Sequence, residues 1–347
     1  MPSRLFVHAT NVHQGGGRSL LIALLKAFDR KFFLSVDKRM PLLDTTKNAR
    51  VKLVRPSVLH RLYAEIWLCK RVAPEDVVLC FGNLPPLFKL RGHTVVFVQN
   101  RYLIEKVTLR GFSFKVRLRL AVERLWLTKR MMNVDEFVVQ TPTMKILLEV
   151  ITRGKVPVRV LPFVAEPGGY VRILSQLKFH GDFVYDFVYV ASGEPHKNHK
   201  KLLDAWCLLA EEGLFPSLCL TLDVTHFPEL GRLIESVRSQ YGVNVNNVGV
   251  LTHNDVLVLY KKSRAAIYPS IFESFGLPLI EARQAGLSVL ASELDFVRDV
   301  IDPEQSFDPE SPLSISRAVK RFLGADEPPL PLLDASQFLA SVFKKDI

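Results

Sequence analysis

Short apolar runs alternate with longer amphipathic segments in the first half of the chain. Residues 5–10 (LFVHAT) predict a strand, residues 15–17 are three glycines that predict a polar turn, and residues 19–28 (SLLIALLKAF) predict a helix. Further apolar runs, separated by helix-like segments, predict strands at 76–81, 93–99 and 136–140. This order is typical of a parallel sheet with crossover helices.

The alternation pauses near residue 160 and then restarts. Residues 161–170 carry two prolines and two glycines, which predict a linker or hinge. Helices are predicted at 199–212 and 229–241, among strands predicted at 183–192, 218–224, 245–251, 265–270 and 289–292. The second half therefore predicts another doubly wound sheet. Two such sheets in tandem leave a cleft, where the carboxyl ends of the strands bind ligand.

We therefore predict an α/β protein of two Rossmann-like, doubly wound domains facing across a cleft. Its length of 347 residues exceeds what a single core usually supports. The expected domains are 1–165 and 166–330, with a proline-rich connector at 327–333 before a last helix at 331–347, which packs back on the N-terminal domain.

Net charge and cysteine content indicate the class of partner and the redox compartment of the protein. The formal charge of +11 favours an anionic partner: nucleic acid, lipid headgroups or a diphosphate ligand. The four cysteines are scattered without a C-x-x-C pair, which favours neither a disulfide framework nor a zinc site and fits a reduced cytoplasmic setting. Because no apolar run is long enough to span a bilayer, we expect any membrane contact to be peripheral.

Residues 268–292 (YPSIFESFGLPLIEARQAGLSVLAS) hold the most informative pattern. A strand ends there, and Pro278 marks the start of a helix because proline suits the first helical turn. Amides of residues 275–277 would point outward at that start, where the helix dipole also favours an anion such as a diphosphate. We place Glu281 in the first turn and Glu273 just before it, as two carboxylates able to accept hydrogen bonds from sugar hydroxyls. For either glutamate alone, a solvated or dipole-offsetting role is the better interpretation.

The whole string resembles the E-x7-E signature of retaining family 4 (group 1) glycosyltransferases of the GT-B fold. The residues that carry this resemblance are Glu273, Ser274, Phe275, Gly276, Leu277, Pro278 and Glu281. It extends to 246–270 and to 189–206, which is similar to the family's strand, loop and Lys-Asn helix start. Within the family, the chain is similar to bacterial enzymes that build surface polysaccharides such as O-antigen.

The resemblance implies a hexosyltransferase that takes a nucleotide-diphosphate sugar as donor substrate and needs no further cofactor. Glu281 would hold the ribose hydroxyls, and Glu273 would contact the donor sugar as the catalytic residue that orients or stabilises the transition state. Ser274, Phe275, Gly276 and Leu277 would lie near the diphosphate, with Gly16 and Gly17 facing it from the other domain.

Lys197 would neutralise the departing diphosphate. Many family members have an arginine before the lysine loop, where this chain has Ser192, Gly193 and Glu194, so Arg18 or His196 is expected to assist Lys197. We predict metal-independent transfer, because the sequence holds no Asp-x-Asp motif.

Acceptor and membrane contacts are expected in the N-terminal half. Gln99, Asn100 and Arg101 follow a predicted strand and could reach a glycan acceptor, although turn formation explains them nearly as well. Residues 101–130 hold nine basic and two acidic residues among many apolar ones, as an interfacial helix requires. We expect this segment, with Lys115, Arg117 and Arg119, to rest on the anionic inner face of the cytoplasmic membrane and receive a polyprenyl-diphosphate-linked glycan.

Three alternatives remain open at this point. A solvated basic face on an ordinary amphipathic helix would explain the charge of 101–130. Another GT-B activity, a sugar phosphorylase or a nucleotide-sugar epimerase, fits the same fold. A basic nucleic-acid-binding protein fits the net charge, but the sequence has no helix-turn-helix, RNP-like or zinc-finger pattern, so we expect no nucleic acid partner.

Overall fold

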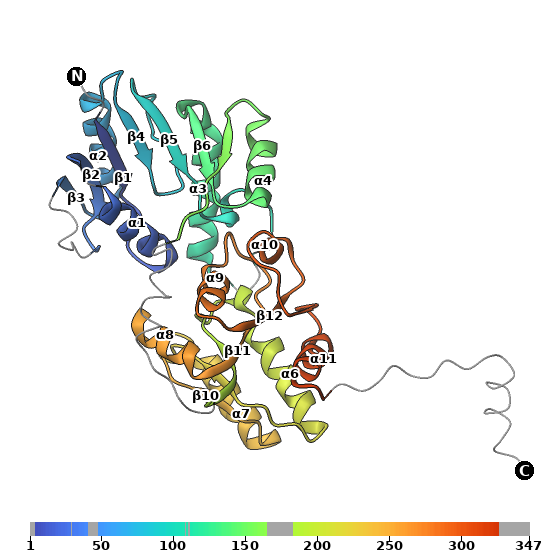
Figure 1. Ribbon diagram of the computed structural model, residues 1–347. Helices are drawn as coiled ribbons and strands as arrows, with labels where there is room; N and C mark the ends of the chain where they lie inside the picture. Colours follow the sequence, from blue (N-terminus) through green and yellow to red (C-terminus); the bar gives the residue numbers. More distant parts are fainter. Residues whose placement is uncertain are drawn as a thin grey trace, which may run out of the picture.

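The computed structural model describes residues 4–28, 30–40, 48–107, 109, 112–164 and 183–325. Two β-sheets, each made of parallel strands and covered by helices, form the two halves of the molecule (Figure 1). The predicted α/β class with two doubly wound units is therefore confirmed. The predicted domain boundary near residue 165, most of the linker, the proline-rich connector and the final helix at 331–347 lie outside the described residues.

The N-terminal sheet has seven strands in the order β3-β2-β1-β4-β5-β6-β7. They are β1 (Leu5–Ala9), β2 (Phe32–Asp37), β3 (Ala49–Val54), β4 (Val77–Cys80), β5 (His93–Phe97), β6 (Glu136–Val139) and β7 (Val158–Val160). Strands β2, β3 and β7 were not predicted from the sequence. Strand β3 lies at an edge, and only Val54 of its residues is buried, so it lacks the continuous apolar run of a central strand.

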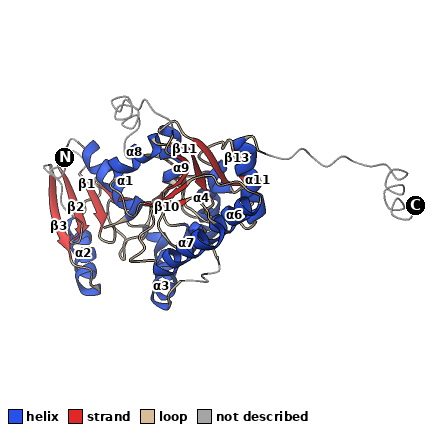
Figure 2. Ribbon diagram, turned by 90° about the horizontal axis from the view of Figure 1, so that it is seen from below, coloured by secondary structure: helices blue, strands red, loops and turns tan. Residues whose placement is uncertain are grey.

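Successive side chains of β1 point to opposite faces of this sheet. Phe6 packs in a core that includes Leu68 of α2 (Val58–Arg71), and also holds residues of α3 (Phe114–Arg130) and α4 (Pro142–Thr152). Val7 packs in a second core with Leu20 of α1 (Gly15–Ala27). Figure 2 shows α2 and α3 on one side of the sheet and α1 on the other. Strand alternation thus places α1 on a face of its own.

The C-terminal sheet has six strands in the order β10-β9-β8-β11-β12-β13. They are β8 (Tyr185–Tyr189), β9 (Leu218–Leu220), β10 (Val245–Asn247), β11 (Ser263–Tyr268), β12 (Ser288–Ser292) and β13 (Gln305–Phe307). The helices are α6 (His199–Glu211), α7 (Pro228–Tyr241), α8 (His253–Lys261), α9 (Leu277–Gln284), α10 (Asp295–Arg298) and α11 (Pro312–Leu323). One core runs through this domain, and Trp206 of α6 and Leu257 of α8 are among its fully buried side chains. Strand β13 was not predicted.

Two local predictions are wrong. Gly15, Gly16 and Gly17 form the first turn of α1 rather than a polar loop, and Gly15 enters it with a left-handed φ of 67°. Glu281 is the fifth residue of α9 and so lies in its second turn. Helix α1 thus begins four residues before the predicted start at residue 19, because glycine without a Cβ atom tolerates the left-handed entry, and α9 begins one residue before Pro278.

Two further observations concern membrane spans and thiols. Among the described residues, no helix combines the length and apolar character that a membrane-crossing segment needs. All four cysteines are free thiols, and three of them are buried.

Candidate active site

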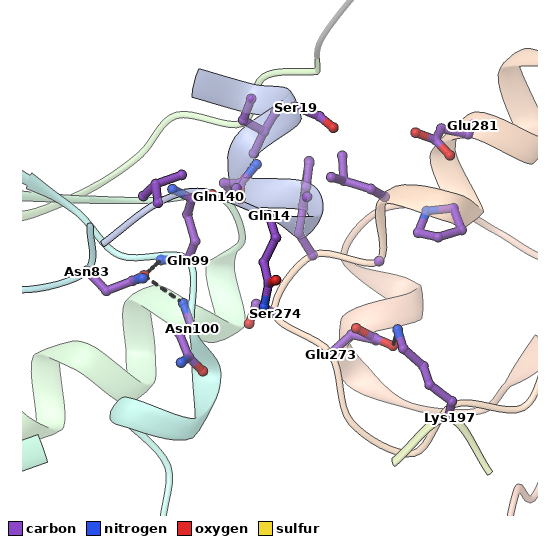
Figure 3. Close-up of a pocket in the computed structure, with 18 of the residues that line it drawn as sticks. Gln14, Ser19, Asn83, Gln99, Asn100, Gln140, Lys197, Glu273, Ser274 and Glu281 are labelled. Carbon is purple, nitrogen blue, oxygen red and sulfur yellow. Dashed lines mark hydrogen bonds and ion pairs between the residues drawn. The ribbon is translucent and has the colours of Figure 1, made fainter. Parts of the chain in front are cut away.

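A cavity of about 530 Å³ lies between the two domains, at the carboxyl ends of both sheets (Figure 3). From the N-terminal domain it is lined by the start of α1 and by polar residues that follow strands β1, β4, β5 and β6. From the C-terminal domain it is lined by the loop and first turns of α9 and by Lys197. The structure therefore brings together, in one cavity, Lys197, Glu273, Ser274, Phe275, Gly276, Leu277, Glu281, Gly16, Gly17, Gln99 and Asn100.

Two helix N-termini face this cavity. Within the described residues, no side chain caps the start of α1 or of α9. Gly276 precedes α9 in the left-handed conformation (φ 68°), and a Cβ atom built on Gly16 would lie 2.9 Å from Cδ1 of Leu277. Glycine at position 16 thus permits the close approach of α1 to α9. Backbone amides and dipoles of both helices create positive potential suited to a diphosphate.

Glu273 is held by three donors inside the C-terminal domain. Its Oε1 accepts hydrogen bonds from Lys197 Nζ at 2.5 Å, Ser270 Oγ at 2.7 Å and Tyr268 Oη at 3.0 Å. Burial raises the pKa of Glu273, but the charges of Lys197 and His196 and the hydrogen bonds from Lys197 and Ser270 outweigh burial and bring the pKa below its usual value. The carboxylate is therefore ionised and fixed in position at neutral pH.

Lys197 is the pocket cation that the sequence predicts, at the end of a 3-10 turn, η4 (Pro195–Lys197). Its carbonyl accepts a hydrogen bond of 2.8 Å from Tyr189 Oη, which anchors this turn to β8. Its side chain is 13% exposed and pairs with Glu273. Neither Arg18 nor His196 is among the residues that line the cavity, so the expected assistance from them is not seen. An incoming diphosphate would share Lys197 with Glu273.

Glu281 projects from α9 on the same side of the cavity as Glu273 (Figure 3). One helical turn separates it from Leu277 at the start of the helix. The glutamate is therefore set back from the amides at the helix start, by about 6 Å of helix rise over four residues.

The loop of residues 99–101, which was expected to face the acceptor, is fixed by a residue that was not predicted. Asn83, in the left-handed conformation (φ 69°), accepts hydrogen bonds at Oδ1 from the backbone amides of Gln99 (2.6 Å) and Asn100 (3.0 Å), as Figure 3 shows. Asn11 and Gln140 also line the cavity and were not predicted. Asn11, Asn83 and Gln140 each stand within three residues of the end of a strand of the N-terminal sheet. Because ligands bind at the carboxyl ends of such strands, a polar residue at this place in the sequence could have been predicted to line the cavity.

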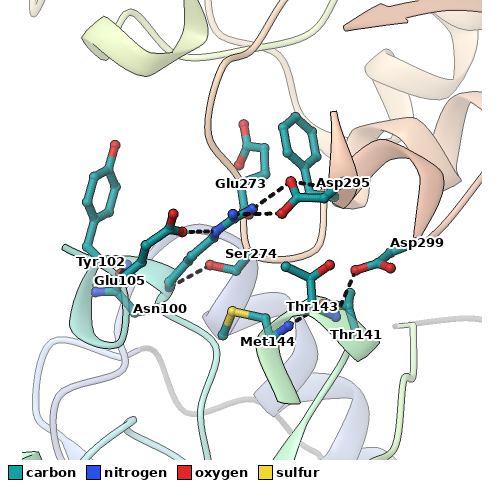
Figure 4. Close-up of polar contacts among 12 residues, drawn as sticks. Asn100, Tyr102, Glu105, Thr141, Thr143, Met144, Glu273, Ser274, Asp295 and Asp299 are labelled. Carbon is teal, nitrogen blue, oxygen red and sulfur yellow. Dashed lines mark hydrogen bonds and ion pairs between the residues drawn. The ribbon is translucent and has the colours of Figure 1, made fainter. Parts of the chain in front are cut away.

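Arg101 is not the acceptor-facing residue that the sequence predicts. Its side chain is 9% exposed and bridges the two domains (Figure 4), because its guanidinium donates to both carboxylate oxygens of Asp295 at 3.0 and 2.8 Å. Its backbone amide donates to Ser274 Oγ at 2.8 Å, and Glu105 is a further carboxylate partner. Arg101 therefore connects the loop of residues 99–101 to the loop that carries Glu273 and Ser274 (the Glu273 loop).

The predicted membrane-facing cations lie on α3 and do not line this cavity. Lys115, Arg117 and Arg119 are exposed. Arg124 is used inside the domain, where it donates to the carbonyls of Tyr102 (2.7 Å) and Glu105 (2.9 Å). Arg110, also in the predicted basic segment, lies outside the described residues. Four exposed apolar residues share the helix at near-helical spacing: Phe114, Leu118, Val122 and Leu125.

The described residues contain no group of three or more histidine, cysteine, aspartate or glutamate side chains that could hold a metal ion. Metal independence stays a prediction.

The sequence comparison decides the class of the C-terminal half. Residues 180–330 match the family described as Glycosyl transferases group 1. This half of the chain is a glycosyltransferase group 1 domain. The match confirms the sequence prediction of a group 1 domain, and the matched residues include Lys197, Glu273 and Glu281. Its assignment to the retaining family 4 stays a prediction.

Bacterial mannosyltransferases are among the relatives of this glycosyltransferase domain. The serotype-specific mannosyltransferase WbdA of Escherichia coli is 31% identical over 134 residues, which are 38% of this chain and 16% of WbdA. The O-antigen chain mannosyltransferase B of Escherichia coli is 30% identical over 142 residues, 40% of this chain and 37% of that enzyme. The matches thus span less than half the length of either relative.

Solved structures share the whole architecture. An α,α-trehalose-phosphate synthase (UDP-forming) from Burkholderia vietnamiensis superposes with a TM-score of 0.68 at 12% identity, over 93% of this chain and 92% of that chain. Anabaena HepE, in complex with UDP and glucose, gives a TM-score of 0.65 at 12% identity, over 93% and 90%. At this identity the likeness establishes the fold, and the GT-B prediction is confirmed.

Proposed function

We propose that this protein is a retaining, metal-independent hexosyltransferase. It moves a hexose from a nucleotide-diphosphate sugar to a lipid-linked glycan acceptor during synthesis of a bacterial surface polysaccharide. The observation that carries the proposal is the interdomain cavity, in which two uncapped helix N-termini, Lys197, Glu273 and Glu281 lie together within the described residues. The O-antigen mannosyltransferase relatives support a surface polysaccharide as product.

Each part of the donor has a matching group in this cavity. The diphosphate is anionic and fits the amides at the starts of α1 and α9 together with Lys197. The ribose carries vicinal hydroxyls and fits the carboxylate of Glu281. The hexose then lies toward Glu273 and the acceptor-side residues Gln99 and Asn100.

In the proposed reaction, the acceptor hydroxyl oxygen forms a bond to the anomeric carbon while the bond from that carbon to the diphosphate oxygen breaks. The departing diphosphate takes the hydroxyl proton, and attack on the face that it leaves retains the configuration. Charge develops on the diphosphate as it departs, so preorganised donors at α1, α9 and Lys197 stabilise the transition state. The fixed carboxylate of Glu273 stabilises positive charge on the sugar ring.

Nucleotide binding is the direct test. Thermal melting of the protein with a panel of nucleoside diphosphates should raise the Tm for one base in particular, because a ligand that binds only the folded state stabilises it by mass action. Incubation with the matching nucleotide sugar and an acceptor should release the nucleoside diphosphate. Failure of every nucleoside diphosphate to raise the Tm would refute the donor assignment. Product formation that requires free phosphate would indicate a phosphorylase instead.

We further propose that α3 rests on the anionic inner face of the cytoplasmic membrane. Its outer surface mixes the exposed cations Lys115, Arg117 and Arg119 with Phe114, which is 76% exposed, and Leu118, which is 54% exposed. Such a surface combines apolar burial with electrostatic attraction. Each basic residue near an anionic leaflet contributes about 1 kcal/mol.

Co-sedimentation with vesicles tests this surface. Binding to anionic vesicles should be strong at low salt and weak at high salt. Replacing Lys115, Arg117 and Arg119 by glutamate should lower the partition coefficient by at least about a hundredfold, from about 1 kcal/mol per removed charge. The matched control replaces three exposed cations of the C-terminal domain by glutamate: Lys200, Arg232 and Arg317. An equal loss of vesicle binding in both triple variants would show that net charge alone causes the binding, and would refute the proposed membrane surface on α3.

A further inference from the structure

A second cleft opens in the N-terminal domain beside the donor cavity. It has a volume of about 440 Å³, and Asn11, Asn83 and Asn100 line both spaces. Its other lining residues follow strands β1, β2 and β3 or lie on helices α2 and α3. The cleft therefore occupies the carboxyl edge of the N-terminal sheet, where α/β proteins bind ligands. It is joined to the donor cavity through the acceptor-side asparagines.

The lining of this cleft is strongly basic. Three guanidinium groups line it, those of Arg39, Arg61 and Arg119, together with the imidazole of His13. Among the described residues that line it, Glu123 is the one carboxylate, and its Oε1 lies 3.9 Å from Nε of Arg119. An anion in the cleft would therefore meet more positive than negative charge.

These guanidinium groups come from separate elements and are differently restrained. Arg39 is clamped by Asp37, which accepts hydrogen bonds of 3.0 and 2.7 Å from its Nε and Nη2. Arg61 has a buried Nε with no hydrogen-bond partner among the described residues. Arg119 is 63% exposed on α3. Arginine groups arranged around a space favour a phosphate, because guanidinium N–H pairs match its oxygens.

Exposed apolar side chains lie on the two helices that line the basic cleft, and one of them, Val58, belongs to the lining itself. On α2, Val58 lines the cleft and is 82% exposed, and Leu59 and Leu62 are 77% and 37% exposed. On α3, Leu118 and Val122 are each 54% exposed, next to the lining residues Arg119 and Glu123. A ligand that joins a phosphate to an apolar chain would therefore find Val58 in the cleft and further apolar side chains on the same helices.

We propose that this cleft binds the phosphate group of the acceptor substrate, while the acceptor hydroxyl reaches the donor cavity past Asn83 and Asn100. The inference rests on the proposed glycosyl transfer. The donor diphosphate already has its own place at the starts of α1 and α9 with Lys197, so a phosphate in the second cleft belongs to the other substrate. That phosphate comes either from a lipid-linked acceptor or from a soluble sugar phosphate.

Calorimetric titration of the full chain separates these sources. The donor cavity is first saturated with the nucleoside diphosphate that raises the Tm most, and the protein is then titrated with farnesyl diphosphate, a hexose phosphate, or farnesol as the phosphate-free probe. Both phosphate compounds should bind, and farnesol should bind more weakly than either of them. Tighter binding of farnesyl diphosphate assigns the phosphate to a lipid carrier, and tighter binding of the hexose phosphate assigns it to a soluble acceptor.

Two variants test the residues. Arg119→Gln, on the exposed α3 side chain, should weaken phosphate binding about tenfold to a hundredfold, and Arg61→Gln combined with it should weaken binding further. The matched control is the pair Arg71→Gln and Arg91→Gln, two exposed arginines of the same domain that do not line the cleft. Equal affinities in the control and in the Arg119→Gln variant, or binding of neither phosphate compound, would overturn the inference. Absence of nucleoside diphosphate binding by the unaltered protein would instead refute the proposed function.

Discussion

Substitution of Lys197 by alanine should have two separable effects, on stability and on donor binding. In the unliganded protein, Lys197 Nζ lies 2.5 Å from Glu273 Oε1, and the two side chains are 13% and 14% exposed. Removing one member of such a buried pair usually costs about 3–5 kcal/mol, because the partner stays buried and charged. Ser270 and Tyr268 still donate to the same oxygen, so we expect the lower end of that range.

Donor affinity falls for a different reason. Lys197 is the cation of the donor cavity among its described lining residues, and a charge-assisted hydrogen bond contributes about 1.5–3 kcal/mol. Lys197→Ala should therefore weaken nucleoside diphosphate binding about tenfold to a hundredfold. The matched control is Lys200→Ala, which removes the same charge from an exposed position three residues along the chain and outside the cavity.

A double variant distinguishes the two effects. Lys197→Ala combined with Glu273→Gln leaves no unpaired buried carboxylate, so most of the lost stability should return in thermal or denaturant unfolding. The affinity for nucleoside diphosphate, measured by calorimetry, should stay low because the cation is still missing. Wild-type affinity in Lys197→Ala would refute the donor assignment. A double variant as unstable as the single one would refute the electrostatic explanation of the stability loss.

Glu281, the metal requirement and the Arg101–Asp295 bridge can each be tested separately. Glu281→Gln should weaken nucleoside diphosphate binding about tenfold or more yet leave inorganic pyrophosphate binding unchanged, since the lost charge-assisted bond is to ribose; parallel losses for both would contradict this. Sugar transfer should persist in EDTA, and loss of activity that added Mg²⁺ or Mn²⁺ restores would show a metal requirement. In a double-mutant cycle on donor kcat/KM, Arg101→Ala and Asp295→Ala should show a coupling energy of about 1 kcal/mol. Solvent screening limits this energy because Asp295 is 44% exposed. Additive effects would mean that the bridge does not position the Glu273 loop.

The sequence by itself determined those features that depend on neighbouring residues. The strand, turn and helix start around residues 268–292 could be predicted because apolar alternation, Gly276 and Pro278 act locally on backbone conformation. Most central strands of both sheets were predicted for the same reason, as continuous apolar runs. Strand β2 is the exception, because most of its residues are buried and yet it was not predicted. Edge strand β3 and short strand β13 were missed because few of their residues are buried.

Only the tertiary structure decided how the candidate site is assembled. Lys197 and Glu273 are 76 positions apart, and Arg101 and Asp295 are 194 apart. No local pattern distinguishes a lysine that pairs with a buried carboxylate from one at a solvated helix start, or an arginine that bridges two domains from one that faces an acceptor. These roles depend on which surfaces the two sheets bring together across the cleft. Arg101 is buried in the contact between the domains, whereas its neighbours Gln99 and Asn100 line the cavity.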